Sequence, residues 1–308
     1  MSTPGQISVT VDIEAGIAEV RALPRRSALG REAAGLRRDA LDGMLAIAGS
    51  PLAAGEVAAL LDRGVTLGAH PLEAYIAARD LAAAAAWVDE QRTHRPGDHA
   101  PLLGLEDVRR IHALATAGSP AGHPGAWRTT VVVSSGGVVS PPPWIVPFET
   151  GALLERFRER PAGEMPVWVA AFLARFARIR PFVDANRRTA LLATTLVLRR
   201  LEAPPLAIGR AQASAFRRAL AGATAGDAEP LQALVAHALA AACNRLVAAA
   251  GDDALVPLRA LAGSSYAALI KAAKRGRLRT IVRGGRVLST AAWVAAYRAS
   301  GRERRPRG

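Results

Sequence analysis

Cysteine, aromatic residues and long apolar runs are scarce in this chain of 308 residues. Its single cysteine, Cys243, has no partner for a disulfide, so nothing in the sequence indicates an oxidising compartment. The opening residues, MSTPGQISVTVDIEAG, lack the basic and apolar segments of a secretory signal. The apolar runs are interrupted by polar residues before they reach the ~18 residues that a membrane span needs. We therefore expect a cytoplasmic protein that does not enter a membrane.

Alanine and leucine dominate the composition, and 50% of the residues are apolar while only 5% are aromatic. Such a composition favours helices over pleated sheet, and the chain is long enough to bury a substantial core. The one convincing hairpin signal in the first 250 residues is TTVVVSSGGVVSPPPW, residues 129–144, where two β-branched runs flank Ser-Ser-Gly-Gly. We predict a mainly α fold with one hairpin in this part.

The net charge of +14 is unevenly distributed along the chain. Residues 271–308 hold twelve Lys or Arg and one acid, Glu303, which gives this segment a formal charge of +11. Basic charge concentrated on one element favours a polyanionic partner. The alternative is a tail that only improves solubility.

The segment RIRPFVDANRRTALL, residues 178–192, has the pattern of a loop that leads into an apolar helix. A loop before a helix offers unpaired backbone amides to an anion, and the helix dipole assists. The segment therefore predicts a phosphate-handling site at the start of a helix near position 188.

The same segment resembles the core of the Fic family of AMP-transferases. Further segments occur in the family's usual order: LEAYIAARDLAAAAAWV, LEDVRRIHALATAG, Gly-Ala-Trp-Arg at 125–128 and the hairpin that ends in Pro-Pro-Pro before the loop, then EAPPLAI and AFRRALAGATAGDAEPLQALVAHAL after it. The resemblance covers about residues 35–250. It implies a Fic-type helical bundle in which the hairpin is a flap beside the active site.

In the family the loop reads His-Pro-Phe-x-Asp-Gly-Asn-Gly-Arg-x-x-Arg, and the reaction transfers AMP from ATP to a protein hydroxyl. The resemblance implies that the histidine is the general base, the acid binds Mg²⁺, and the glycine-rich turn with the first arginine holds phosphates. It therefore implies Asp184 as the metal-binding residue and, as the nucleotide- or phosphate-binding residues, Asn186, Arg187 and Arg188.

Four positions depart from the family pattern. Arg180 stands at the position of the histidine, and a guanidinium with a pKa above ~12 cannot accept a proton at neutral pH. Ala185 and Arg187 replace both glycines, which strains the backbone wherever φ is positive. Leu191 replaces the last arginine, so a charged donor to the terminal phosphates is lost.

A further departure concerns the family's inhibitory helix, whose glutamate pairs with that last arginine. Ala48 occupies the comparable place in Ile-Ala-Gly-Ser-Pro-Leu, residues 47–52. Removing both partners of an ion pair avoids stranding a charge. We expect impaired AMP transfer, with the binding of ATP and Mg²⁺ weakened or lost.

Three interpretations of the loop remain open. It is a packing relic, or an anion site that binds nucleotide or phosphate without transferring it, or the site of an active transferase with a non-standard base such as His112. The flap hairpin, residues 129–143, is expected to pair with an extended segment of a partner protein, because strand addition needs no base. The alternative is that the flap hairpin only covers the cleft.

Residues 254–298 read as a short helix, a turn, a second helix, a hairpin around Arg-Gly-Gly and a closing helix. This outline resembles the excisionase- or MerR-type winged helix-turn-helix modules that bind DNA. The resemblance places the DNA-contacting cations on the second helix and the wing: Lys271, Lys274, Arg275, Arg277, Arg279, Arg283 and Arg286. The alternative is a basic module that packs on the rest of the chain or binds RNA.

Together these features predict three regions. Residues 1–100 form an N-terminal helical region that packs on the core, 101–250 form the Fic-like core, and 251–308 form the basic module with a disordered tail. The polar segment AAGDDALVP supports the boundary near 250.

Overall fold

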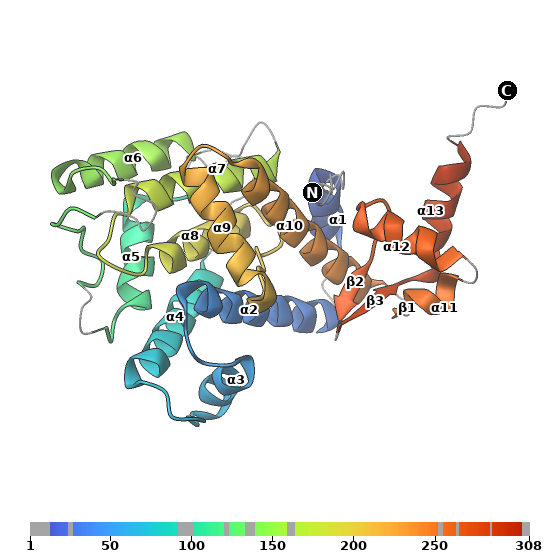
Figure 1. Ribbon diagram of the computed structural model, residues 1–308, viewed down its shortest axis with the longest axis horizontal. Helices are drawn as coiled ribbons and strands as arrows, with labels where there is room; N and C mark the ends of the chain where they lie inside the picture. The colour runs from blue at the N-terminus through green and yellow to red at the C-terminus, as the bar shows by residue number, and fades with distance from the viewer. Residues whose placement is uncertain are drawn as a thin grey trace, which may run out of the picture. The chain divides into compact units, whose positions relative to one another are not determined.

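The computed structural model describes most of the chain, and within that part the fold is mainly helical, as predicted (Figure 1). The described residues are 13–23, 27–91, 101–119, 123–132, 139–158, 164–251, 255–262, 265–283 and 285–303. Contacts divide the chain into two compact units, one of Gly35–Val235 and the other of Met1–Ala34 with Ala236–Gly308. The division falls inside two long helices, α2 (Ser27–Ala48) and α10 (Glu229–Ala250).

In its described residues the larger unit is built from helices, apart from the two arms of the flap. Its complete elements are α3 (Ala54–Arg63), α4 (Leu72–Glu90), α5 (Leu105–Ala115), α6 (Val146–Arg156), α7 (Met165–Ile179), α8 (Asn186–Arg200) and α9 (Ala213–Thr224), with 3₁₀ turns at Pro143–Ile145 and Arg210–Gln212.

Helix α8 forms the centre of the larger unit. It packs against α4, α5 and α7, and its apolar residues are buried on all sides because the run TALLATTLVL has no polar face. The helix begins at Asn186, two residues before the predicted start. The core of the unit thereby fixes the place where the loop 180–185 enters a helix.

The carboxyl end of α2 is held in a tight turn. Gly49 has a positive φ of 86°, and the amides of Gly49 and Ser50 donate to the carbonyls of Ala46 and Leu45, the pattern of a Schellman cap. One turn earlier in the helix, Gly43 has no room for a side chain, because a Cβ atom there would lie 1.6 Å from the Ile208 carbonyl oxygen.

Helix α10 is 22 residues long and, in the part of the chain that the structure describes, is the one helix long and apolar enough to cross a membrane by length and composition. Core helices of soluble proteins pass the same test, and Leu231, Val235 and Leu239 of α10 are buried inside the structure.

The smaller unit combines short helices with a three-stranded antiparallel sheet. Its elements are α1 (Ile13–Ala22), β1 (Val256–Pro257), α11 (Leu258–Ala262), α12 (Tyr266–Lys274), β2 (Ile281–Arg283), β3 (Arg286–Ser289) and α13 (Ala291–Glu303). The strand order is β1-β3-β2. The hairpin β2–β3 lies where the Arg-Gly-Gly turn predicts it, with Val282 opposite Val287, whereas β1 is not predicted by the sequence pattern.

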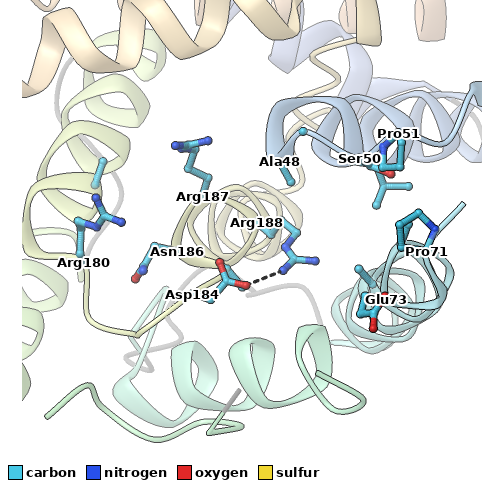
Figure 2. Close-up of a pocket in the computed structure, with 16 residues that line it drawn as sticks. Ala48, Ser50, Pro51, Pro71, Glu73, Arg180, Asp184, Asn186, Arg187 and Arg188 are labelled. Atoms are coloured by element: carbon cyan, nitrogen blue, oxygen red, sulfur yellow. Dashed lines mark ion pairs between the residues drawn. The ribbon is translucent and has the colours of Figure 1, made fainter. Parts of the chain in front are cut away.

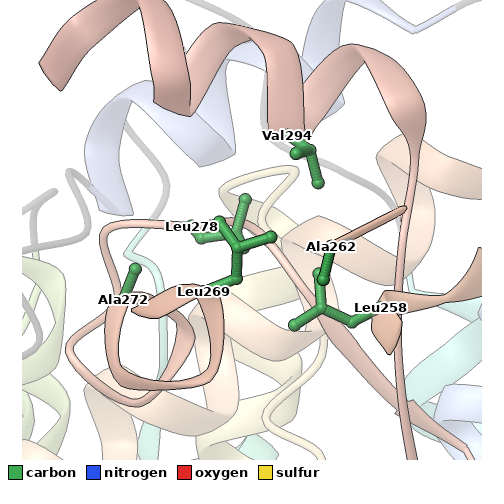
Figure 3. Close-up of a cluster of buried hydrophobic side chains, with 6 residues drawn as sticks. All are labelled: Leu258, Ala262, Leu269, Ala272, Leu278 and Val294. Atoms are coloured by element: carbon green, nitrogen blue, oxygen red, sulfur yellow. The ribbon is translucent and has the colours of Figure 1, made fainter. Parts of the chain in front are cut away.

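Side chains from α11, α12, the following turn and α13 form a hydrophobic core of their own (Figure 3). They are Leu258, Ala262, Leu269, Ala272, Leu278 and Val294. Helix α1 belongs to the same unit, and its Glu19 forms an ion pair with Arg279, with N–O distances of 3.0 and 2.7 Å. A Cβ atom on Gly16 would lie 3.4 Å from the sulfur of Cys243 in α10.

Candidate active site in the larger unit

A cavity of about 550 Å³ opens between the end of α2, the start of α4, the end of α7 and the loop before α8 (Figure 2). Its lining residues are Leu45, Ala48, Gly49, Ser50, Pro51, Pro71, Glu73, Ala74, Ala77, Ala177, Arg180, Asp184, Ala185, Asn186, Arg187 and Arg188. None of these is a histidine. The structure therefore gathers every site residue predicted from the loop into one pocket, and three of them are arginines.

Two residues of the loop adopt the left-handed conformation that favours glycine. Arg180 has φ 48° and ends α7, and its amide donates to the Phe176 carbonyl. Ala185 has φ 54° and precedes α8. Such backbone costs a residue with a side chain roughly 1–2 kcal/mol. Of the two positions where the family has glycine, only Ala185 carries this strain, because Arg187 lies within the helix.

Asn186 closes the loop through the main chain of Phe182. Its Oδ1 accepts from the Phe182 amide at 3.0 Å, and its Nδ2 donates to the Phe182 carbonyl at 2.8 Å. Asn186 is buried, and both polar atoms of its side-chain amide take part in shaping the turn. A ligand would therefore meet the backbone that Asn186 positions more readily than the Asn186 side chain.

Asp184 and Arg188 form an ion pair across the turn, with 3.6 Å between Oδ2 and Nη2 (Figure 2). The Asp184 side chain is 64% exposed, whereas Arg188 is nearly buried. No group of three or more His, Cys, Asp or Glu residues suited to a metal ion occurs in the described ranges. Mg²⁺ is commonly held by one or two carboxylates together with substrate phosphates. The single carboxylate of Asp184 fits this ion only when a phosphate supplies further oxygens.

Arg187 reaches from α8 to the end of α2. Its Nη1 donates to the Ile47 carbonyl at 3.3 Å. Burial lowers the pKa of Arg187, and the neighbouring cations Arg180 and Arg217 lower it further, while Asp184 acts in the opposite direction. Positive charge thus exceeds negative charge at this end of the cavity.

His112, the predicted substitute base, lies beneath the loop and does not line the cavity. It is 2% exposed, and its Nδ1 accepts from the Gly125 amide at 3.0 Å. Its ring stacks on Phe182 at 3.7 Å, and Phe182 in turn stacks on Trp127. Burial lowers the pKa of His112 to about 4, against the opposing effect of Asp184. Nε2 makes no hydrogen bond of good geometry in the described structure.

The model of the Fic/DOC family matches residues 102–198, a range that includes the loop and most of α8. Residues 102–198 are therefore similar to a Fic/DOC domain. This family is known for the transfer of AMP and related phosphate groups.

Solved structures with Fic domains share the fold. Fic-1, residues 134–508, from Caenorhabditis elegans matches with a TM-score of 0.66 and 20% identity over 77% of this chain and 69% of that one. A Fic-domain signalling protein from Bacteroides thetaiotaomicron matches with a TM-score of 0.61 and 19% identity, over 76% and 95%. A Fic family protein from Desulfovibrio desulfuricans matches with 0.57 and 23%, over 79% and 77%. At these identities the likeness shows the fold and not the activity.

Arg128 is a structural residue of the larger unit, and the sequence alone did not predict its role. It is 2% exposed, and its guanidinium donates to four main-chain carbonyls. The acceptors are Thr130, Pro141, Ile179 and Arg180, at 2.7, 2.5, 3.2 and 2.7 Å. Arg128 thereby fastens both arms of the flap to the end of α7. The segment Gly-Ala-Trp-Arg, residues 125–128, marks this arginine in the sequence, but it does not show which carbonyls accept its hydrogen bonds.

The flap is described at its two arms, residues 129–132 and 139–143, while the predicted tip at 133–138 lies outside the described residues. The Ser140 amide donates to the Val132 carbonyl at 3.2 Å, so the arms are paired at the base. Val131 and Val139 are 62% and 63% exposed. Nearby in the sequence, Trp144 and Phe148 are 79% and 75% exposed.

The predicted DNA-contacting cations occupy different environments in the smaller unit. Most of them are exposed on α12, the turn after it and the start of β3: Lys271, Lys274, Arg275, Arg277 and Arg286. Arg279 is engaged by Glu19. The backbone of Arg283 lies in β2, but its side chain is not among those described.

Proposed function

We propose that this chain is a Fic-fold protein that binds a nucleotide or another phosphate-bearing ligand in the arginine-lined cavity and is impaired in AMP transfer. The observation that carries the proposal is the lining of the cavity, which includes three arginines and no histidine. Anion binding needs only cations and backbone amides. Transfer also needs a proton acceptor for the attacking hydroxyl.

The loss of the proton acceptor determines the rate of AMP transfer that we expect. Arg180 lines the cavity where the Fic motif has its histidine, and a guanidinium stays protonated at neutral pH. The absence of a general base typically costs ~10²–10⁴-fold in rate. His112 cannot serve as the substitute base, because it is buried under Phe182 outside the cavity.

Binding is supported by features that the departures leave in place. The loop enters α8 at Asn186, so the positive end of the helix dipole faces the cavity. Arg187 and Arg188 add charged donors suited to phosphate oxygens. Mg²⁺ bound together with a phosphate would neutralise part of the ligand's charge, and Asp184 would hold it.

The alternative is an active transferase of AMP or another phosphate-linked group that uses a non-standard base. Asp184 and Glu73 are the carboxylates in the cavity lining, and a carboxylate is the remaining proton acceptor there. The alternative is weakened by the ion pair that Asp184 makes with Arg188.

The test uses the full chain with radiolabelled ATP, Mg²⁺ and a cell lysate, beside calorimetric binding of ATP and pyrophosphate. We expect binding without protein labelling, and Arg188→Gln should weaken binding at least tenfold through the loss of a charged donor. Arg178→Gln, which removes an exposed arginine of α7 that does not line the cavity, is the matched control. Labelling that disappears in Asp184→Ala would establish the alternative.

We further propose that the smaller unit binds DNA through α12 and the turn after it. Lys274 and Arg275 follow Lys271 by three and four residues at the end of α12, where Arg275 is the C-cap; all three are exposed, and Arg277 follows in the turn. The separate hydrophobic core holds this helix and the β2–β3 hairpin as a winged helix-turn-helix would. Cations of this kind contact phosphates and do not by themselves read sequence.

Salt dependence tests the DNA proposal. Replacing Lys274 and Arg275 by glutamine should reduce the slope of log affinity against log salt concentration by about 2, because each phosphate contact contributes about 0.9. Arg279→Gln should leave duplex binding within about twofold of wild type, since Glu19 already holds that guanidinium. Equal slopes for the double variant and the wild type would remove α12 from consideration.

The flap is proposed as a surface for a protein partner. The exposed Val131 and Val139 on its arms and the exposed Trp144 beyond them support this, because large apolar side chains at the surface are enriched in interfaces. An extended segment that adds to the flap as a strand fits this surface. Replacing Val131 and Val139 by lysine should abolish capture of that partner while anion binding persists.

A further inference from the structure

The end of α2 is joined to the cavity by two arginines that bind adjacent carbonyls. Arg187 of α8 donates to the Ile47 carbonyl at 3.3 Å, and Arg217 of α9 donates to the Ala46 carbonyl at 2.8 Å. These carbonyls carry the partial negative charge of the helix end. Of the two arginines, Arg187 lines the cavity and Arg217 does not.

The two carbonyls differ in their other partners. Ala46 also accepts from the Gly49 amide, which belongs to the turn that follows α2. For Ile47 the described hydrogen bond comes from Arg187 alone. Withdrawal of Arg187 therefore leaves the last turn of α2 without a side-chain cap at Ile47, while Arg217 continues to hold Ala46.

A ligand phosphate is a stronger partner for a guanidinium than a neutral carbonyl is. Arg187 also stands in excess positive charge, with Arg180 and Arg217 near it and Asp184 opposing them. An anion in the cavity would relieve that repulsion, whereas the Ile47 carbonyl relieves it only in part. Arg187 thus has two competing acceptors, one in the fold and one in the ligand.

We propose that an anion in the cavity and the carboxyl end of α2 compete for the guanidinium of Arg187, so that occupancy of the cavity loosens the turn at Gly49–Pro51. This inference rests on the proposed anion binding. The turn itself lines the cavity, as Figure 2 shows for Ala48, Ser50 and Pro51. Arg187 is here a positioning residue that couples ligand binding in the cavity to the end of α2. Ala48, at this end of α2, occupies the position comparable to the family's inhibitory glutamate.

Hydrogen exchange of the full chain with and without saturating inorganic pyrophosphate tests the coupling. In the wild type the amides of Gly49 and Ser50, which donate to Ala46 and Leu45, should exchange about fivefold faster with pyrophosphate, the effect of losing one ordinary hydrogen bond. In Arg187→Met these amides should exchange at the faster rate without pyrophosphate and show no further change on its addition.

Arg217→Met is the matched control, because it removes the neighbouring cap from outside the cavity. In this variant the amides of Gly49 and Ser50 should exchange faster than in the wild type even without pyrophosphate. Adding pyrophosphate should still accelerate their exchange. If calorimetry shows pyrophosphate binding but the turn stays unchanged or slows, or if Arg187→Met still responds, the coupling is wrong while the proposed function stands. If the wild type binds no pyrophosphate, both are wrong.

Discussion

Asn186 and Phe182 exchange two hydrogen bonds across the turn that leads into α8, and each bond joins the Asn186 side-chain amide to the Phe182 main chain. Both residues are buried, and Phe182 lies between the rings of His112 and Trp127. The turn is therefore held by interior contacts that do not depend on a ligand.

Replacing Asn186 by alanine should lower the free energy of unfolding by about 2–3 kcal/mol, because two buried hydrogen bonds are lost and the Phe182 amide is left without a partner. Urea denaturation measures the change. Asp184→Ala, on the same loop but exposed, should cost less than about 1 kcal/mol. Equal losses for the two variants would show that the amide does not hold the turn.

Ala185→Gly should raise the free energy of unfolding by about 0.5–1 kcal/mol. The substitution relieves the left-handed backbone at φ 54° and loses part of that gain to the greater freedom of glycine in the unfolded chain. Ala190→Gly, in the right-handed backbone of α8, should lower it by about 1 kcal/mol. A destabilised Ala185→Gly variant would contradict the strain at this position.

The stability of the chain should depend on the protonation of His112. Its pKa is about 4 in the folded protein and about 6.5 when unfolded, so the unfolded chain takes up the proton first. The contribution of His112 is complete above about pH 6.5 and declines as the pH falls to 4, by about 3 kcal/mol in all.

Urea denaturation at several pH values, compared with His112→Gln, isolates this contribution. The variant should lose about 3 kcal/mol less than the wild type between pH 7 and pH 4, because glutamine does not titrate there. His237→Gln, at an exposed position on α10, should keep the wild-type dependence. Parallel curves for wild type and His112→Gln would exclude a buried neutral imidazole.

Arg180→His should not restore AMP transfer by itself. Leu191, at the place of the family's last arginine, is 3% exposed and offers no donor to a terminal phosphate. Arg187 also keeps its guanidinium in the cavity. Transfer of labelled AMP to lysate proteins should remain at background, with a Fic protein of intact motif as the positive control. Strong labelling by the single variant would show that the phosphate site is intact.

Much of the fold could be predicted from the sequence, because its elements follow from periodic patterns of apolar and polar residues. The apolar run of α8 and the hairpin β2–β3 are each predicted by local patterns. Strand β1 was not predicted, since Val256–Pro257 becomes a strand only by pairing with β3, far along the chain.

The sequence predicted which residues form the site but not which groups they contact. The family motif located the loop, and the rule for positive φ applied at Ala185 but not at Arg187. The partners of Arg128 and Arg187 are main-chain carbonyls, which every residue possesses and no pattern marks. The burial of His112 likewise follows from packing around Phe182, which local sequence does not encode.

The ion pair between Glu19 and Arg279 joins residues that are 260 positions apart. During synthesis Glu19 leaves the ribosome long before Arg279, so α1 must wait for its partner. The residues of the larger unit, which end at Val235, emerge earlier and can fold first. The smaller unit is consequently completed after the larger one, from segments that precede and follow it along the chain.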